Sequence, residues 1–89
     1  MLTSKQRSNL KSIAANLQPI GQCGKGGVNE NMIASFSEAL EARELIKINV
    51  LENAEEGAKA LGQELAAALS AECVAVIGRK VILYRRSSR

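Results

Sequence analysis

Three stretches of the chain carry apolar residues at the spacing of an amphipathic helix. The first begins with a capping-box pattern, Thr3 followed by Gln6, and ends before Pro19, because the residue preceding a proline is pushed out of the helical region. The other two are predicted over residues 29–43 and 54–70. The positions that we expect to face the core are Leu10, Ile13, Ala14 and Leu17 in the first helix, Met32, Ile33, Phe36 and Leu40 in the second, and Leu61, Leu65, Ala68 and Leu69 in the third.

Four shorter stretches have the pattern of β-strands. The clearest is residues 44–51, where isoleucine and valine alternate with Lys47 and Asn49. The others are predicted at residues 20–23, 73–77 and 81–85. The last two are joined by Gly78-Arg79-Lys80, which indicates a hairpin with a basic tip.

The order of these elements predicts the fold class. A helix followed by β-α-β-α-β-β is typical of a two-layer α/β sandwich, with a mixed four-stranded sheet containing crossover-connected parallel pairs and a final antiparallel hairpin. A chain of 89 residues is long enough for one domain, so we expect residues 1–89 to form a single unit. The order of the strands in the sheet does not follow from the pattern.

A glycine-rich loop, Gly24-Lys25-Gly26-Gly27, lies between the first predicted strand and the second predicted helix. Glycines reach positive φ at low cost and let a ligand approach main-chain N–H groups. Asn29 is a candidate N-cap, and a helix N-terminus adds further donors and the positive end of the dipole. The combination predicts a cradle for an anion such as phosphate, although an isolated GxxG equally fits a tight turn.

Charge is segregated along the chain. The nine acidic residues are all glutamates between Gly26 and Glu72, whereas nine of the twelve cations lie outside that segment, four before it and five after it. This polarity favours a polyanion as partner. We expect Lys25 to share one basic face with several of Lys5, Arg7, Lys11, Arg79, Lys80, Arg85 and Arg86.

The composition argues against several classes of protein. The chain has no histidine and no aspartate, and its glycine loop has neither the GxxxxGK[ST] nor the GxGxxG spacing of nucleotide-binding loops. We therefore expect that the protein is not an enzyme and that it uses no small-molecule substrate, cofactor or metal. Cys23 and Cys73 are expected to be buried and reduced. No apolar run spans a membrane and no secretory signal is present, so we expect a soluble, cytoplasmic protein. We also expect it to be a monomer. With Phe36 and Tyr84 as its aromatics, base stacking is not the expected binding mode.

An ordered set of short motifs resembles a known family across almost the whole chain. The set is Leu2-Thr3 with Lys5-Gln6-Arg7, Leu10-Lys11, Pro19-Ile20, Gly24-Lys25-Gly26-Gly27, Glu44-Leu45-Ile46-Lys47, Val76-Ile77-Gly78-Arg79 and Leu83-Tyr84-Arg85. It is similar to the CRM domain, the chloroplast RNA splicing and ribosome maturation module, and above all to its single-domain bacterial form, the YhbY family.

The resemblance implies an RNA-binding domain related in fold to the C-terminal domain of bacterial translation initiation factor 3. It also implies association with precursors of the large ribosomal subunit, and intron splicing for the plant relatives. The family's GxxG loop maps onto residues 24–27, with a glycine in the third position that many relatives give to another residue. The RNA-binding residues would then be Gly24, Lys25, Gly26 and Gly27 with Lys5, Arg7, Lys11, Arg79, Lys80, Arg85 and Arg86.

Three other classes remain open from the residues alone. A KH domain also uses a GxxG loop, but there the loop joins two helices. A phosphate-handling enzyme would need one of the glutamates as its base. A protein-interaction module would present an acidic face, with Glu38, Glu41 and Glu44 against a basic ribosomal protein.

Overall fold

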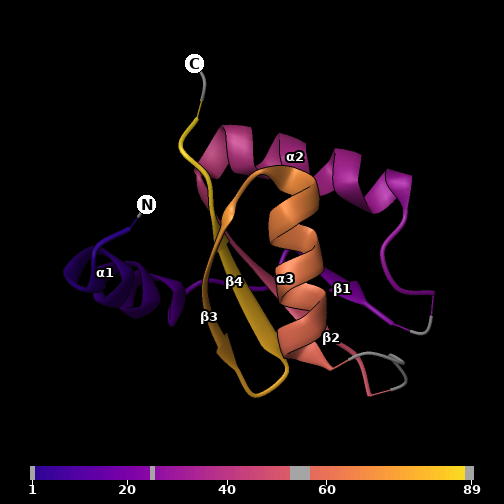
Figure 1. Cartoon of the computed structure of the whole chain (residues 1–89), viewed down its shortest axis with the longest axis horizontal. Helices are drawn as coiled ribbons and strands as arrows, with labels where there is room; N and C mark the ends of the chain where they lie inside the picture. The colour runs from indigo at the N-terminus through magenta and orange to yellow at the C-terminus, as the bar shows by residue number, and fades with distance from the viewer. Residues whose placement is uncertain (1, 25, 53–56, 88–89) are drawn as a thin grey trace.

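The computed structural model describes residues 2–24, 26–52 and 57–87, and within them the predicted order of elements is confirmed (Figure 1). The helices are α1 (Ser4–Ala14), α2 (Glu30–Arg43) and α3 (Ala58–Leu69). The strands are β1 (Gly21–Cys23), β2 (Leu45–Val50), β3 (Glu72–Ile77) and β4 (Lys80–Tyr84). None of the helices in the described ranges is long and apolar enough to cross a membrane.

The four strands form one mixed sheet in the order β1-β2-β4-β3. β1 is parallel to β2, whereas β4 is antiparallel to both β2 and β3. This topology brings the carboxyl ends of β1 and β2 and the β3–β4 turn to one end of the sheet, which we call the loop end. The start of β3 and the end of β4 lie at the opposite end, which we call the far end.

Helices cover both faces of the sheet. α2 and α3 pack on one face and form the predicted two-layer sandwich, while α1 lies across the other face (Figure 1). The larger cluster includes the side chains Phe36, Leu40, Ile46, Ile48, Leu61, Leu65, Val81 and Leu83. The smaller cluster beneath α1 is built on Ala14, Leu45, Val74 and Ile82. The alternation of β2 therefore divides its side chains between two packed faces.

Two helix starts have the predicted caps. The Gln6 N–H donates to Thr3 Oγ1 at 3.1 Å, and the Thr3 N–H donates to Gln6 Oε1 at 2.9 Å, which completes the capping box. The Met32 N–H donates to Asn29 Oδ1 at 2.9 Å. α3 begins after its N-cap Gly57, and the predicted start at residue 54 lies outside the described residues.

Two positions predicted to face the core are exposed. Ile13 is 56 % exposed because α1 contacts the sheet through Leu10, Ala14 and Leu17. Ala68 is exposed because α3 packs through a stripe that contains Ala66 and Gly62 instead. A Cβ on Gly62 would lie 3.2 Å from Val81 Cγ1, so this glycine lets α3 approach the strands closely.

Candidate nucleic-acid interface

The glycine loop forms a turn at the loop end. The Gly27 N–H donates to the Gly24 carbonyl at 2.9 Å, and Gly27 has a φ of 66°, a conformation in which side chains are strained. Apart from its chain neighbours, no atom of the described residues lies within 4 Å of a Cβ built on Gly26 or Gly27, so both positions are open to that part of the chain. Lys25, the predicted cation of this loop, lies outside the described residues. The turn uses the Gly27 N–H, which is therefore not a donor for an anion.

The start of α2 favours an anion less than the sequence predicted. The Asn29 side chain already accepts the Met32 N–H, and the carboxylate of Glu30 lies in the first turn. That carboxylate interacts favourably with the helix dipole and repels a phosphate that approaches the same end. The anion site is therefore better placed on the side of the loop that faces the β3–β4 turn.

Backbone hydrogen bonds join the β3–β4 turn to the end of β2, and the residue after β2 to the end of β1. The Val50 N–H donates to the Arg79 carbonyl at 2.6 Å, and the Leu51 N–H donates to the Cys23 carbonyl at 2.7 Å. The first bond is made by the last residue of β2, and the second by the residue that follows it. Arg79 and Lys80 consequently lie at the loop end, together with Gly24–Gly27 at the end of β1.

The cations of the turn are accessible. The guanidinium of Arg79 is 3.0 Å from Glu52, but the two side chains are 56 % and 84 % exposed. Exposed pairs of this kind contribute about 0 to 1 kcal/mol, so a phosphate can replace the carboxylate at little cost. Lys80 is exposed as well. Sequence reasoning missed Lys59, an exposed cation in the first turn of α3, because it lies among glutamates in the sequence.

Other predicted site residues lie toward the far end. Arg7 Nη1 donates to the carbonyls of Cys73 and Val74 at 3.1 and 3.4 Å, at the start of β3. Arg85 and Arg86 follow β4, whose length separates them from Lys80 by about 16 Å at the rise of a strand. The expectation of one shared basic face therefore needs correction, because these arginines do not lie beside the loop.

Arg85 is turned inward. Its Nη1 donates to the Leu69 carbonyl at 2.9 Å, and its Nη2 lies 2.9 Å from the Ser37 carbonyl and 3.3 Å from Glu41 Oε1. Its side chain is 19 % exposed. These contacts make Arg85 a connector of helices rather than a surface cation.

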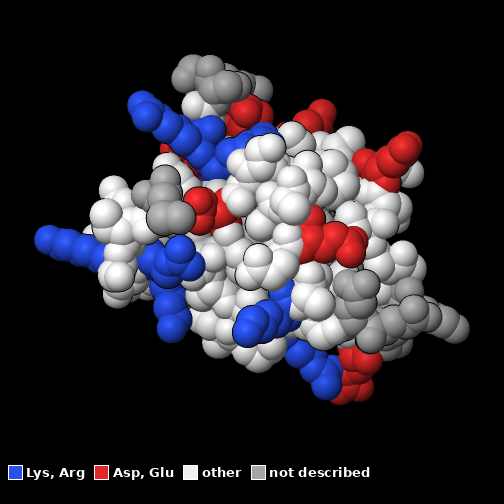
Figure 2. All heavy atoms as spheres, in the orientation of Figure 1, with Lys and Arg blue, Asp and Glu red and all other residues white. Residues whose placement is uncertain are grey.

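The surface shows the same division. Figure 2 has basic side chains along the lower edge of the view, where Figure 1 places the β3–β4 turn, and separate ones over α1 and near the C-terminus. Lys5, Lys11 and Arg86 are exposed, the first two on α1. The described cations thus form a loop-end group and a group on α1 and the far end.

The acidic face predicted for a protein partner is partly used inside the molecule. Glu41 contacts Arg85, and it accepts the Ser87 hydroxyl at 3.3 Å. Glu44 Oε2 accepts the Ser87 N–H at 2.7 Å. Of the three glutamates proposed for that role, two therefore hold the C-terminal residues against α2.

The two cysteines are free thiols, Cys23 buried and Cys73 partly buried. Burial raises the pKa of the Cys23 thiol, and Glu64 raises it further. Burial also raises the pKa of Cys73, against the opposing effect of Arg7. Both thiols are therefore neutral at pH 7. The described residues contain no cluster of histidine, cysteine or acidic side chains that could hold a metal ion.

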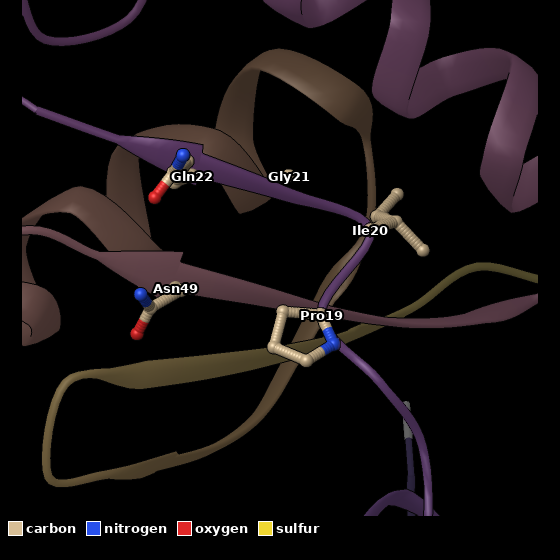
Figure 3. A pocket seen from close by; sticks show the side chains of 5 residues that line it. All are labelled: Pro19, Ile20, Gly21, Gln22 and Asn49. Carbon is tan, nitrogen blue, oxygen red and sulfur yellow. The ribbon is translucent and has the colours of Figure 1, made fainter.

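Two polar side chains at the loop end were not predicted as functional. Gln22 and Asn49 are adjacent on the parallel strands β1 and β2 and line a hollow with Pro19, Ile20 and Gly21 (Figure 3). The sequence shows them only as a glutamine and an asparagine inside two predicted strands, at positions that do not have to be apolar. Their proximity depends on the pairing of β1 with β2.

The fold and the loop end define a class: a small α/β domain in which a glycine turn follows the first strand, at the same end of the sheet as the turn of a basic hairpin. A KH domain is excluded, because its GxxG loop would join two helices. The chain belongs to the CRS1/YhbY (CRM) domain family, which matches residues 2–85.

Similar proteins are known from several organisms. The chain is 49 % identical over 87 residues to "Probable RNA-binding protein YqeI" of Bacillus subtilis, covering 98 % of this chain and 91 % of that protein. It is 31 % identical over 88 residues to a "Probable RNA-binding protein" of Pseudomonas aeruginosa, covering 99 % and 85 %. The solution structure of a hypothetical protein from Staphylococcus aureus matches with a TM-score of 0.84 and 48 % identity, covering 100 % of this chain and 93 % of that one.

Proposed function

We propose that this protein binds structured RNA through its loop end. The interface comprises Gly24, Lys25, Gly26 and Gly27 with the turn residues Arg79 and Lys80. The observation that supports it most directly is that the strand order brings two exposed cations to the end of the sheet from which the open glycine turn extends. The names of the similar proteins support RNA as the partner.

The proposed contacts are to the RNA backbone. Arg79, Lys80 and Lys25 neutralise phosphates, and the open turn lets the backbone approach without meeting a side chain. Such contacts provide affinity and orientation but carry no sequence information. The protein therefore recognises the shape of its RNA, acting by binding and not by catalysis.

The RNA that we propose is precursor large-subunit rRNA during ribosome assembly in the cytoplasm. The support is the resemblance to the single-domain bacterial form of the family. Crosslinking in cells followed by sequencing of the attached RNA tests this assignment. Recovery of mature messenger RNA alone would contradict it.

The salt dependence of binding tests the interface itself. With three to four loop-end cations, the logarithm of affinity should fall against the logarithm of salt concentration with a slope of about −2 to −3 for a single strand. Arg79→Ala with Lys80→Ala should make that slope shallower by about 1.4 and weaken binding at every salt concentration. The measurement is fluorescence anisotropy on one labelled RNA.

The matched control is Lys5→Ala with Arg86→Ala, which removes the same net charge from α1 and the far end. We expect it to leave the slope nearly unchanged. Equal effects of the two double variants would mean that net charge, and not the loop end, determines binding.

A further inference from the structure

An open hollow lies at the start of α2, which follows the glycine turn directly along the chain (Figure 1). Two of its residues precede the helix and four belong to it: Val28, Asn29, Glu30, Ile33, Ala34 and Ser37. The four helical positions are spaced i, i+3, i+4 and i+7, so they share one face of α2. We call these six residues the α2 hollow.

The walls of the α2 hollow are mainly apolar. Val28 and Ile33 pack against the larger core cluster with part of their surface and leave the rest accessible, and Ala34 beside them is exposed. The hollow has a volume of about 580 Å³, within the roughly 300 to 1,000 Å³ of sites that take small ligands. An accessible apolar surface next to a polar binding surface favours burial of an apolar part of the partner.

The α2 hollow is unsuited to phosphate. None of the described residues that line it is a cation, and the exposed carboxylate of Glu30 repels an anion. The side chain of Asn29 already accepts the Met32 N–H. The hollow therefore favours a neutral group with apolar faces, whereas Arg79 and Lys80 favour phosphate.

The glycine turn connects directly to the α2 hollow. Gly27 is followed by Val28, and consecutive Cα atoms are about 3.8 Å apart. Gly26 and Gly27 are both open to the described part of the chain, so a nucleotide backbone can lie against the turn. A backbone in that position brings its bases next to Val28. The charged phosphates and the neutral bases of one strand thus match two neighbouring surfaces of the protein.

We propose that the α2 hollow binds an unpaired base of the RNA whose phosphates lie at the loop end, an inference that rests on the proposed function. The base covers the aliphatic side chains of Val28, Ile33 and Ala34 and removes their apolar surface from water. Bases in loops and bulges can be turned outward in this way, whereas those of a continuous helix are held by pairing and stacking. Apolar contact with the ring does not read its hydrogen-bonding edge, so the hollow selects unpaired RNA and not one of the four bases.

The experiment compares two RNA hairpins by fluorescence anisotropy. They share one stem and one short loop length, but the loop consists either of uridines or of abasic ribose residues. Both carry the same number of phosphates, so their electrostatic contributions match. The unsubstituted protein should bind the uridine loop about three- to tenfold more tightly, the gain for burying on the order of 30 to 50 Å² of apolar surface. Equal affinities for the two hairpins would overturn the inference and leave the proposed function standing.

Two variants test whether the base lies in the α2 hollow. Ile33→Ser removes part of the apolar wall, and Ala34→Gln fills the hollow with a neutral side chain from an exposed position. Both should weaken binding of the uridine loop and bring the two affinities close together. Ala34→Gln keeps the test valid if the loss of core contacts in Ile33→Ser prevents folding. The control is Ala42→Gln, the same substitution at an exposed position of α2 outside the hollow, which should retain the preference.

The outcomes separate the two proposals. A preference for the uridine loop that survives in the folded Ile33 and Ala34 variants would place the base elsewhere and overturn the inference, as would an equal loss in the Ala42 control. Failure of the unsubstituted protein to bind either hairpin would overturn the proposed function as well.

Discussion

Lys47 places a primary ammonium group in the interior of the sheet, with 9 % of its surface exposed. Its Nζ donates to the carbonyls of Ala14 at 3.2 Å and Leu17 at 3.3 Å. The last carbonyls of a helix lack partners within the helix and carry the negative end of its dipole. Lys47 thus satisfies the C-terminal end of α1 and fixes it on the sheet.

Replacing Lys47 should therefore lower stability. Lys47→Met keeps an apolar stem of similar length but removes the Nζ donor from both carbonyls, of which Ala14 still accepts the Leu17 N–H. We expect the free energy of unfolding to fall by about 1 to 3 kcal/mol, measured by urea denaturation. The control Lys80→Met, at an exposed position, should change stability by less than about 0.5 kcal/mol. If the two substitutions behaved alike, the ammonium would have no role in holding α1.

The requirement for glycine at position 27 comes from its backbone conformation and not from contacts with surrounding atoms. Its φ of 66° is strained for any residue with a Cβ, although the space around it is open. Gly27→Ala should therefore cost about 1 to 2 kcal/mol of stability, or displace the turn and weaken RNA binding. Gly57→Ala is the control, since Gly57 has a φ of −70° and is equally open. Comparable urea transitions and RNA affinities for both variants would mean that the turn accepts a side chain at Gly27 and does not require glycine there.

At the scale of elements, one side chain connects three of them. Arg85, directly after β4, contacts the last residue of α3 through Leu69, and the middle of α2 through Ser37 and Glu41. Its Nε is buried without a partner among the described residues, which reduces the net gain. The connection nevertheless fixes how the two helices lie against the end of the sheet.

Removing this connection should destabilise the fold without a direct effect on RNA. Arg85→Ala removes the side-chain donor to the Leu69 carbonyl together with the contacts to Ser37 and Glu41, and we expect a loss of about 2 kcal/mol in urea denaturation. The control is Arg86→Ala, the exposed neighbour, which should be close to neutral. At temperatures where both variants remain folded, their RNA affinities should match. A loss of RNA affinity in Arg85→Ala but not in Arg86→Ala would show that Arg85 belongs to the RNA-binding interface.

The elements themselves were predictable because their signals are local. The periodicity of the helices, the capping boxes and the turn glycines each depend on residues a few positions apart. The side of the sheet on which α1 packs depends on contacts between distant residues, so the sequence could not reveal that Lys47 is covered. The same limit applies to Arg85. The sequence shows its charge, but not its contacts with α2 and α3, which lie far from it along the chain.

At the scale of the molecule, strand order decides which charges meet. The sequence predicted that cations from both chain ends converge, but the order β1-β2-β4-β3 brings only the hairpin turn to the glycine loop. Arg85 and Arg86 follow the strand that Lys80 begins, so they lie at the far end. The sequence therefore identified candidate cations, while the register of the sheet decides which of the described ones share one end of the molecule.

The separation of the loop-end cations from those on α1 and the far end predicts the length of RNA that the protein contacts. The loop end spans four strands about 4.8 Å apart, or about 14 Å, which corresponds to about four or five nucleotides of a stacked strand at a rise of about 3.4 Å each. An RNA that followed the longest dimension of the molecule, 33 Å, would need about ten. Affinity for single-stranded oligonucleotides of increasing length should accordingly level off near five nucleotides. A continued rise to ten would show that the cations of α1 and the far end also bind the strand, because only a longer path reaches them.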